Sequence, residues 1–496
     1  MLKKLLFLLL CITFTQVYAQ DKKITDTIEL ANNLVSSKKY TQAISLLKRM
    51  AAKNPNNIEP LRLHGKILYW MNDFEGALLF YKKASVKHPT LQLDQAKLLL
   101  DLYRLNKAKA AYTDYLKKDS KNIEALNSLG LIAYYQGQAQ LAKKYFGEVK
   151  KIAPDNEQAN KYLVTIAEAA RPNLHLYGSY ADDSQPLSAI SSGADFDWYY
   201  NHLLAPKLNM QTRHFNADTL KGNLYALYAL YLGNRIYSSD LRLNFFLGGG
   251  VYTSPVDKKA NFMWDVLLNK KLANNFSLDI SVARKPYYNT LSSLQQNVDY
   301  YNYGVSFFYN KVDGWMWQIG YIAQRFNDYN TLQNLNAYVV SQPIKLGDVN
   351  FYLGYAFSYG SATTDHFTAT STIAEAFATN NYNPIYTPYY TPKNELENAV
   401  LANLVYKPSK ALKLAVNSRV GFYATSDRGF FFLEKNDAGE TIIAKDFSSQ
   451  KFTPYQINGQ ISYSPSSSFT LNADYIYGNT FFYHIKTATL GLNLKF

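Results

Sequence analysis

The chain has 496 residues, too many for one ordinary domain, and 47% of them are hydrophobic, which excludes a disordered chain. Its formal net charge is +14, from 52 Lys and Arg against 38 Asp and Glu. The single cysteine excludes a disulfide scaffold, a cysteine-ligated zinc site and an iron–sulfur protein.

Residues 1–19 have the three-part pattern of a secretory signal peptide. Two lysines, Lys3 and Lys4, precede an apolar run over Leu5–Leu10, and Ala19 provides a small residue at the expected cleavage point. The apolar run is shorter than the roughly 20 residues that a membrane-spanning helix needs. We therefore expect the protein to be exported and the signal peptide to be removed.

Residues 20–170 carry a repeating pattern. Alanine recurs at spacings of 34, 31 and 34 residues, at Ala43, Ala77, Ala108 and Ala142. Proline follows three of these alanines by 12 residues, at Pro55, Pro89 and Pro154. The period and the small residues resemble the tetratricopeptide repeat, whose unit is a helix pair. We predict four such pairs, with Glu157–Ala170 as a capping helix.

The resemblance implies a binding scaffold, because the first helix of each repeat lines a concave face in this family. We expect a periplasmic protein or glycan to bind there. The residues expected to face the groove are Arg62, Lys66, Tyr69, Lys97, Asn127 and Tyr134. Lysine is spread over every predicted helix, which is typical of a solvated surface, so we expect no nucleic-acid partner.

After Arg171 the helical period of 3.6 gives way to a period of two. In the last run of the chain, alternate residues from Ala488 to Phe496 share one apolar face. Runs of about ten alternating residues, separated by turns and rich in aromatic residues, are typical of transmembrane β-barrels. The predicted fold class is therefore α + β in two domains: an α-solenoid over 20–170 and an antiparallel outer-membrane barrel over 171–496.

The strand count depends on one weakly alternating segment. Counting back from Phe496 gives 16 strands if Tyr199–Asn216 holds two strands broken at Pro206, and 14 otherwise. We expect short turns, one of them at Gly233-Asn234, to alternate with long loops, which include Asp183–Asp195, Thr290–Gln296, Ala362–Lys393 and Ser426–Gln450. With the repeats and the short turns in the periplasm, the first strand runs outward and the last strand runs inward. The number of strands must therefore be even.

The chain ends inside its last predicted strand. Leu492, Leu494 and Phe496 resemble the C-terminal assembly signal of outer-membrane barrels. That resemblance implies two partners, the barrel-assembly machinery and outer-membrane lipid.

Alternation also predicts which side chains point into the barrel. The polar residues expected in the lumen are Arg242, Asp265, Asp279, Gln318, Lys413, Asn417, Arg419 and Asp474. Both signs of charge are present, which suits either a hydrated channel or a plug of paired side chains. No catalytic or metal-binding motif rises above chance, so we expect no enzyme activity, no catalytic residues, no metal and no cofactor.

Helical repeats followed by a barrel resemble the bacterial exporters of exopolysaccharides such as cellulose and poly-N-acetylglucosamine. Four repeats with a barrel of this size are similar to the YaiO family of outer-membrane proteins. The resemblance implies a channel or docking component for export of an envelope polysaccharide. The alternative is a non-transporting anchor or assembly protein whose repeats bind a periplasmic partner.

Overall fold

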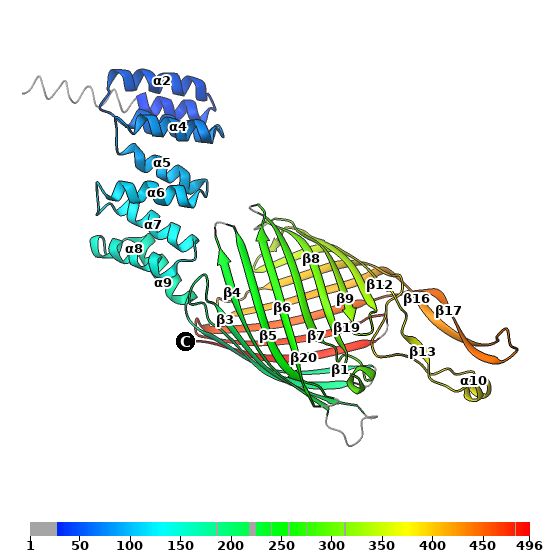
Figure 1. The fold of residues 1–496 in the computed structure, drawn as a ribbon. Coiled ribbons are helices and arrows are strands. Elements are labelled where there is room, and N and C mark those ends of the chain that lie inside the picture. Colours follow the sequence, from blue (N-terminus) through cyan, green and yellow to red (C-terminus); the bar gives the residue numbers. More distant parts are fainter. Residues whose placement is uncertain are drawn as a thin grey trace, which may run out of the picture. The chain divides into compact units, whose positions relative to one another are not determined.

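The computed structural model describes residues 27–184, 187–217, 225–239, 241–255, 258–273, 275–311, 314–481 and 483–496. The predicted signal peptide lies outside these residues. The chain divides into two compact units, with the boundary between Ile166 and Ala167. The first is helical and the second is a β-barrel (Figure 1).

The helical unit is a series of short helices in which each packs against the next. After helical residues 27–36 come α2 (Tyr40–Lys53), α3 (Glu59–Trp70), α4 (Phe74–Ala84), α5 (Leu91–Asp101), α6 (Leu105–Leu116), α7 (Ile123–Tyr135), α8 (Ala139–Ile152) and α9 (Glu157–Ala169). The predicted helix pairs and the capping helix are all present.

The same turn joins the two helices of every repeat. A residue with positive φ lies five positions before each repeat alanine, and these residues are Lys38, Asn72, Tyr103 and Gly137. Gly65 and Gly130 lie where two helices touch, because a Cβ at Gly65 would overlap Tyr81 and one at Gly130 would lie 2.7 Å from Phe146. The four units therefore agree in backbone conformation as well as in sequence phase.

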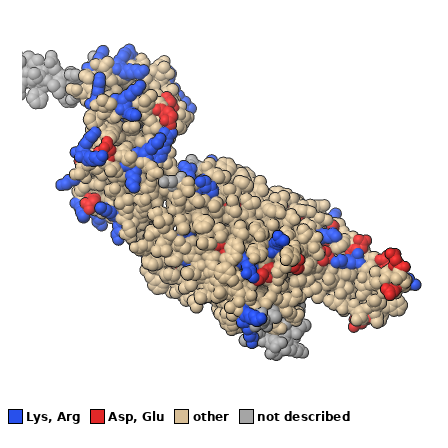
Figure 2. Space-filling view, viewed as in Figure 1, with Lys and Arg blue, Asp and Glu red and all other residues tan. Residues whose placement is uncertain are grey.

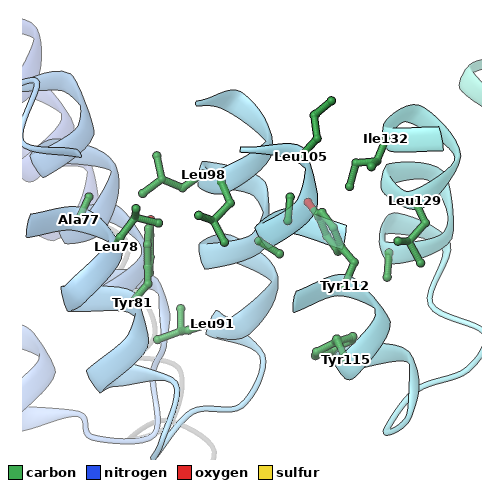
Figure 3. Packing of buried hydrophobic residues seen from close by; sticks show 14 residues of the cluster. Ala77, Leu78, Tyr81, Leu91, Leu98, Leu105, Tyr112, Tyr115, Leu129 and Ile132 are labelled. Atoms are coloured by element: carbon green, nitrogen blue, oxygen red, sulfur yellow. The ribbon is translucent and has the colours of Figure 1, made fainter. Parts of the chain in front are cut away.

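Buried side chains form a continuous core between these helices. Figure 3 shows Tyr112 of α6 lying between helices, with Leu129 and Ile132 of α7 beside it. Tyr112 is 1% exposed, although its repeat is three residues short. The shorter third repeat therefore keeps the same packing. Ala96 occupies the position that Gly65 and Gly130 hold in the second and fourth repeats.

The second unit is a closed antiparallel barrel of 16 strands, as predicted. They are β1 (Asn173–Asp183), β2 (Ser188–Asp197), β3 (Pro206–Asn216), β4 (Tyr225–Ser238), β5 (Leu243–Thr253), β6 (Ala260–Lys271), β7 (Phe276–Pro286), β8 (Asp299–Asn310), β9 (Met316–Phe326), β10 (Thr331–Val340), β12 (Val349–Ala362), β15 (Glu395–Tyr406), β16 (Leu412–Lys435), β18 (Tyr455–Ser466), β19 (Phe469–Asn479) and β20 (His484–Lys495). Pairing of β1 with β20, from Asn173↔Lys495 to Asp183↔Ile485, closes the ring.

Smaller elements decorate the links between these strands. A short strand, β11 (Ile344–Leu346), pairs with β12, and β13 (Phe367–Ala369) pairs with β14 (Pro384–Tyr386). The helices η2 (Ser292–Gln295) and α10 (Ile373–Thr379) lie in two of the longer links. The C-terminal half of β16 pairs with β17 (Thr441–Phe452), and this hairpin extends past the neighbouring strands (Figure 1).

One face of each barrel strand exposes large apolar side chains to the surroundings. Leu490 of β20 is 69% exposed and Ile190 of β2 is 61% exposed. The residues next to each of them in the sequence, which point to the other face of the strand, are polar or small. Figure 2 shows few charged side chains on the visible barrel wall, while Lys and Arg cover the helical repeats. An apolar outer band with a polar interior is the arrangement of a barrel solvated by lipid. In the part of the chain that the structure describes, no helix has the length and apolar character to cross a membrane.

Three expectations about the links are wrong. Tyr199–Asn216 holds only β3, and the sixteenth strand comes instead from β2, which occupies most of the expected loop Asp183–Asp195. Gly233-Asn234 lies inside β4, because Gly233 makes room for the Phe246 ring and does not turn the chain. Ser426–Gln450 is not a loop but mostly the β16–β17 hairpin.

Candidate functional site: the polar hollow inside the barrel

Several aromatic rings lie flat against the inner wall of the barrel, over glycines of neighbouring strands. A Cβ at Gly193 would lie 2.5 Å from the Tyr177 ring, and one at Gly248 would overlap Tyr231. Phe246 covers Gly233 in the same way and stacks beside Tyr231, with their centroids 6.4 Å apart. Glycine in a strand permits this close approach, so the rings lie flat on the inner wall.

A hollow of about 420 Å³ lies beside these rings, on the inner side of β3 to β7. Its basic lining residues are Lys207, Arg213, Arg284 and Lys285, and its acidic ones are Asp195 and Asp265. Its volume is within the range of small-molecule sites. Six charged side chains therefore line one concavity within the barrel.

Some polar atoms of the hollow are satisfied by protein and others are not. Asp195 accepts a hydrogen bond from Asn209 Nδ2 at 2.7 Å, and His175 Nδ1 lies 3.5 Å from its other oxygen. Among the described residues, neither Asp265 Oδ1 nor the Tyr231 hydroxyl has a hydrogen-bond partner, although both atoms are buried. Buried polar atoms are rarely left unpaired, so these two indicate a position where water or a ligand binds.

On the opposite wall of the barrel, Arg419 has a carboxylate partner. Arg419 forms two hydrogen bonds of 2.8 Å with the Glu397 carboxylate and one of 3.2 Å with Ser358. Gln318 donates to Ser306 at 3.4 Å. These side chains bind each other, although Asn458 Oδ1 of β18 is buried without a partner among the described residues.

Two links fold over one end of the barrel, which we call the loop end; the other end, bearing Asn173 and Lys495, is the seam end. Residues 287–298 of the first link and 387–391 of the second form the loop cap, whereas the part of the second link with β13 and α10 packs on the β16–β17 hairpin. Thr290 Oγ1 donates to the Pro388 carbonyl at 2.6 Å, which joins the two links. Leu294, fully buried, packs with Phe215 and Leu227, which lie on the inner wall.

Tyr389 is the centre of the loop cap. It is fully buried and stacks on Phe326 with centroids 3.7 Å apart. Its hydroxyl donates to the Asp328 carboxylate at 2.7 Å. Burial, and then this carboxylate, raise the pKa of Tyr389, so the hydroxyl stays protonated and the bond persists. The cap is therefore held by ring stacking together with a charge-assisted hydrogen bond.

The predicted lumen residues fall into two groups. Those on the strand face opposite the exposed apolar side chains are Asp265, Asp279, Gln318, Lys413, Asn417, Arg419 and Asp474. Arg242 is the exception: it lies in the turn before β5 with φ 49° and is not on a strand. Asp265 alone among the eight lines the hollow. Lys207, Arg213 and Tyr231 also line the hollow but were not predicted as lumen residues. The reason is that β3 alternates poorly and β4 contains a glycine.

The six predicted groove residues do not form one uniform strip. Lys66 and Lys97 are exposed. Arg62 is paired, with Nε 2.9 Å from Asp94 Oδ1. The aromatic members pack on neighbours, Tyr69 on Phe74 at 5.4 Å and Tyr134 on Tyr162 at 5.1 Å.

Asn127, the last of the six, is 6% exposed and donates to Asn156 at 3.3 Å. The two lysines therefore remain the freest candidates for contact with a partner.

The three residues of the expected assembly signal lie at the end of the barrel-closing strand or just after it. Leu492 and Leu494 belong to β20, and Phe496 follows it with its side chain 64% exposed. Phe496 N donates to the Pro172 carbonyl at 3.1 Å. The C-terminus is thus fixed to the residue that precedes β1.

No known protein-family profile matches the chain. Over 140 residues the chain is 25% identical to DnaJ homolog subfamily C member 7 of the mouse, Mus musculus. The match covers 27% of this chain and 28% of that protein, so the chain spans little more than a quarter of the relative's length.

Solved structures resemble the two units separately. A bacterial polysaccharide outer membrane secretin superposes with a TM-score of 0.47 at 8% identity, covering 66% of this chain and 99% of that one. A tetratricopeptide repeat protein from Parabacteroides merdae gives a TM-score of 0.25 at 22% identity over 29% of this chain and 58% of that one. MamA from Desulfovibrio magneticus RS-1 gives 0.24 at 17% identity, over 28% and 81%.

Proposed function

We propose that this protein is an outer-membrane channel for export of an envelope polysaccharide, with its repeats as the docking component. The observation that carries the proposal is the inner wall, where ring faces held on glycine lie next to amide and charged side chains. The assignment to a YaiO-like family, which rests on the resemblance of the sequence, is also part of this proposal. The proposal assigns the protein no enzymatic role.

The chemistry of sugars fits such a wall. A sugar ring has a C–H face, which packs on an aromatic face, and an edge of hydroxyls, which both donate and accept hydrogen bonds. Tyr177, Tyr231 and Phe246 lie on the inner wall, and Tyr231 lines the hollow together with the amides of Asn209 and Gln211. A polymer of sugars can therefore exchange contacts along the wall as it moves.

The lengths of the links support an orientation. The three longest links between barrel strands, 287–298, 363–394 and 436–454, are all at the loop end. Bacterial barrels place short turns in the periplasm and long loops outside. The repeats precede Asn173 at the seam end, so this orientation assigns them to the periplasm.

Lys66 and Lys97 support the docking role of the repeats. They occupy the same position in successive repeats, each 11 residues before its repeat alanine, and both are exposed on first helices. Two lysines that are spaced one repeat apart are suited to binding an acidic peptide or glycan.

The loop cap favours a second candidate, a barrel that serves only as an anchor. Leu294 and Tyr389 are fully buried in the cap, so tightly packed residues lie at the loop end. An anchor needs no passage, whereas a channel needs the cap to move.

A strain that lacks the protein tests the proposal when complemented with wall variants. We expect Tyr177→Ala, Tyr231→Ala and Phe246→Ala together to lower surface polysaccharide and to leave polymer in the periplasm. The matched control is Tyr180→Ala with Tyr475→Ala, two tyrosines that are 50% and 51% exposed on the outer face. Unchanged surface polysaccharide in the wall variant, at equal protein levels, would overturn the proposal.

A further inference from the structure

The hollow inside the barrel has an excess of positive charge, with four basic and two acidic side chains in its lining. Of its four basic residues, Arg284 is paired with Asp299 at 2.9 Å. In the described part of the chain, Lys207, Arg213 and Lys285 form no salt bridge. On the opposite wall Arg419 has its own carboxylate, that of Glu397. Lys413 of β16 also forms no salt bridge among the described residues, so what distinguishes the hollow is that it brings three unpaired cations together.

One of these cations is held in place by an aromatic ring. The guanidinium of Arg213 lies 4.8 Å from the centroid of the Phe215 ring. Phe215 is 4% exposed and belongs to the cluster under the loop cap. A cation–π contact of this kind fixes a guanidinium while leaving its N–H donors free to bind an anion.

The two unpaired buried oxygens belong to β4 and β6, the two strands that flank β5. The Tyr231 hydroxyl lies over Gly248, and Gly248 is the cross-strand partner of Asp265. Together they offer one donor and acceptor, the phenol, and one pure acceptor, the carboxylate. A hydroxyl group that donates to Asp265 Oδ1 and accepts from Tyr231 would satisfy both.

We propose that the hollow is a binding site for an acidic saccharide, with Lys207, Arg213 and Lys285 binding the carboxylate of the sugar. Asp265 and the Tyr231 hydroxyl bind its ring hydroxyls, and the ring of Tyr231 packs against its C–H side. This inference rests on the proposed function and names its substrate class, an envelope polysaccharide that contains acidic sugars.

The presence of Asp265 distinguishes this site from a simple anion trap. A small inorganic anion gains nothing from a carboxylate beside it, whereas a sugar can donate a hydroxyl to Asp265 while its own carboxylate lies near Arg213. The 420 Å³ volume also exceeds what one small ion would fill. The mixed lining thus favours a molecule with both an anionic group and hydroxyls.

The test is isothermal titration calorimetry on the full-length protein in detergent. The probes are tri-galacturonate, neutral maltotriose of equal length, and inorganic phosphate. We expect tri-galacturonate to bind at least about tenfold more tightly than either other probe, because charge-assisted hydrogen bonds to its carboxylates are added to the sugar contacts. Equal binding of tri-galacturonate and maltotriose would overturn the proposal, and equal binding of phosphate would reassign the hollow to anions in general.

Two variants and one control place the binding in the hollow. Arg213→Gln and, separately, Lys285→Gln should each weaken tri-galacturonate binding about tenfold. Lys413→Gln, which removes a lumen cation outside the hollow, should leave it unchanged. Heat-dependent gel mobility verifies that each variant is a folded barrel. An equal loss in Lys413→Gln would show that general lumen charge, and not this site, binds the sugar.

Calorimetry needs no conduction, so the two proposals fail separately. Selective tri-galacturonate binding with no transport would overturn the channel and leave the site standing. Transport of polysaccharide without selective binding would overturn the site alone.

Discussion

Arg171 binds the C-terminal residue Phe496, with Nε donating to the Phe496 carbonyl at 3.2 Å across 325 positions of sequence. Its Nη2 also donates to the Lys495 carbonyl at 2.6 Å and to the Ser468 hydroxyl. The Arg171 guanidinium thus binds both the end of β20, the closing strand, and the turn that precedes β19. This is the place where the chain must join its first and last strands.

Replacing Arg171 should weaken barrel closure without preventing it. Hydrogen bonds to a charged donor contribute about 1.5–3 kcal/mol each when shielded and less when exposed as here. We expect Arg171→Ala to lower the temperature at which the barrel loses its compact gel mobility. Lys410→Ala, in the exposed turn between β15 and β16, is the matched control. Equal midpoints for both variants would show that the Arg171 contacts add no stability.

Removing the last strand should abolish assembly. Residues 484–496 supply the partner of β1 over the whole Asn173–Asp183 strand, and an open edge in lipid leaves backbone groups unpaired at several kcal/mol each. We expect deletion of 484–496, and Phe496→Asp to a lesser degree, to eliminate the heat-modifiable form in outer-membrane fractions. The helical signal should persist in circular dichroism. Normal membrane levels of the truncated protein would contradict the closed ring.

The repeats should lose stability in mild acid through one histidine. His64 is 7% exposed and packs on Phe80, and burial together with Lys48 lowers the pKa of His64 to about 4. The unfolded chain takes up the proton near pH 6.5, before the folded one does. Stability is therefore complete above about pH 6.5 and is lost as the pH falls toward 4.

Thermal unfolding followed by helical circular dichroism checks this. His64→Gln should flatten the dependence of the midpoint between pH 6.5 and pH 4, whereas His88→Gln in the link before α5 should keep the wild-type slope. An unchanged slope in His64→Gln would assign the acid sensitivity to another group.

The exposed lysines of the first helices should matter for partner capture. Lys66→Glu with Lys97→Glu reverses two charges that make no ion pair within the described residues, so the fold should be unaffected. Pull-downs of periplasmic proteins and glycans with the full-length protein should lose acidic partners. Lys82→Glu with Lys83→Glu, at the end of α4, makes the same charge change on a second helix. Identical captured sets in both variants would remove the groove hypothesis.

The fold could be predicted from sequence where side chains alternate strongly or repeat in phase. The helix pairs and the closing strand were found in this way. Strand β2 was missed because Ser, Gly and Ala dominate it, so that Ile190 is its main apolar signal. Gly233 was interpreted as a turn, but it accommodates the Phe246 ring, a contact that only the three-dimensional pairing of β4 with β5 creates.

The candidate site was predictable only in part. Asp265 follows from alternation, but the hollow also needs Arg213 and Lys285, which are 72 positions apart and meet only when the ring closes. The loop cap had no sequence signal, because Tyr389 and Leu294 come from links that carry no period. Sites that depend on barrel closure and on loop packing therefore need the structure.

Single-channel recording in planar bilayers tests the central claim, a channel closed by a movable cap, most directly. The pair to compare is wild-type protein and Tyr389→Ala, which removes the ring stacked on Phe326 and the bond to Asp328. We predict discrete conductance steps in both, with larger and longer openings in Tyr389→Ala. Arg419→Gln, which alters the paired wall and leaves the cap intact, should keep the wild-type open time. An absence of conductance in wild type and in Tyr389→Ala, at equal insertion of folded protein, would contradict the channel and leave the anchor.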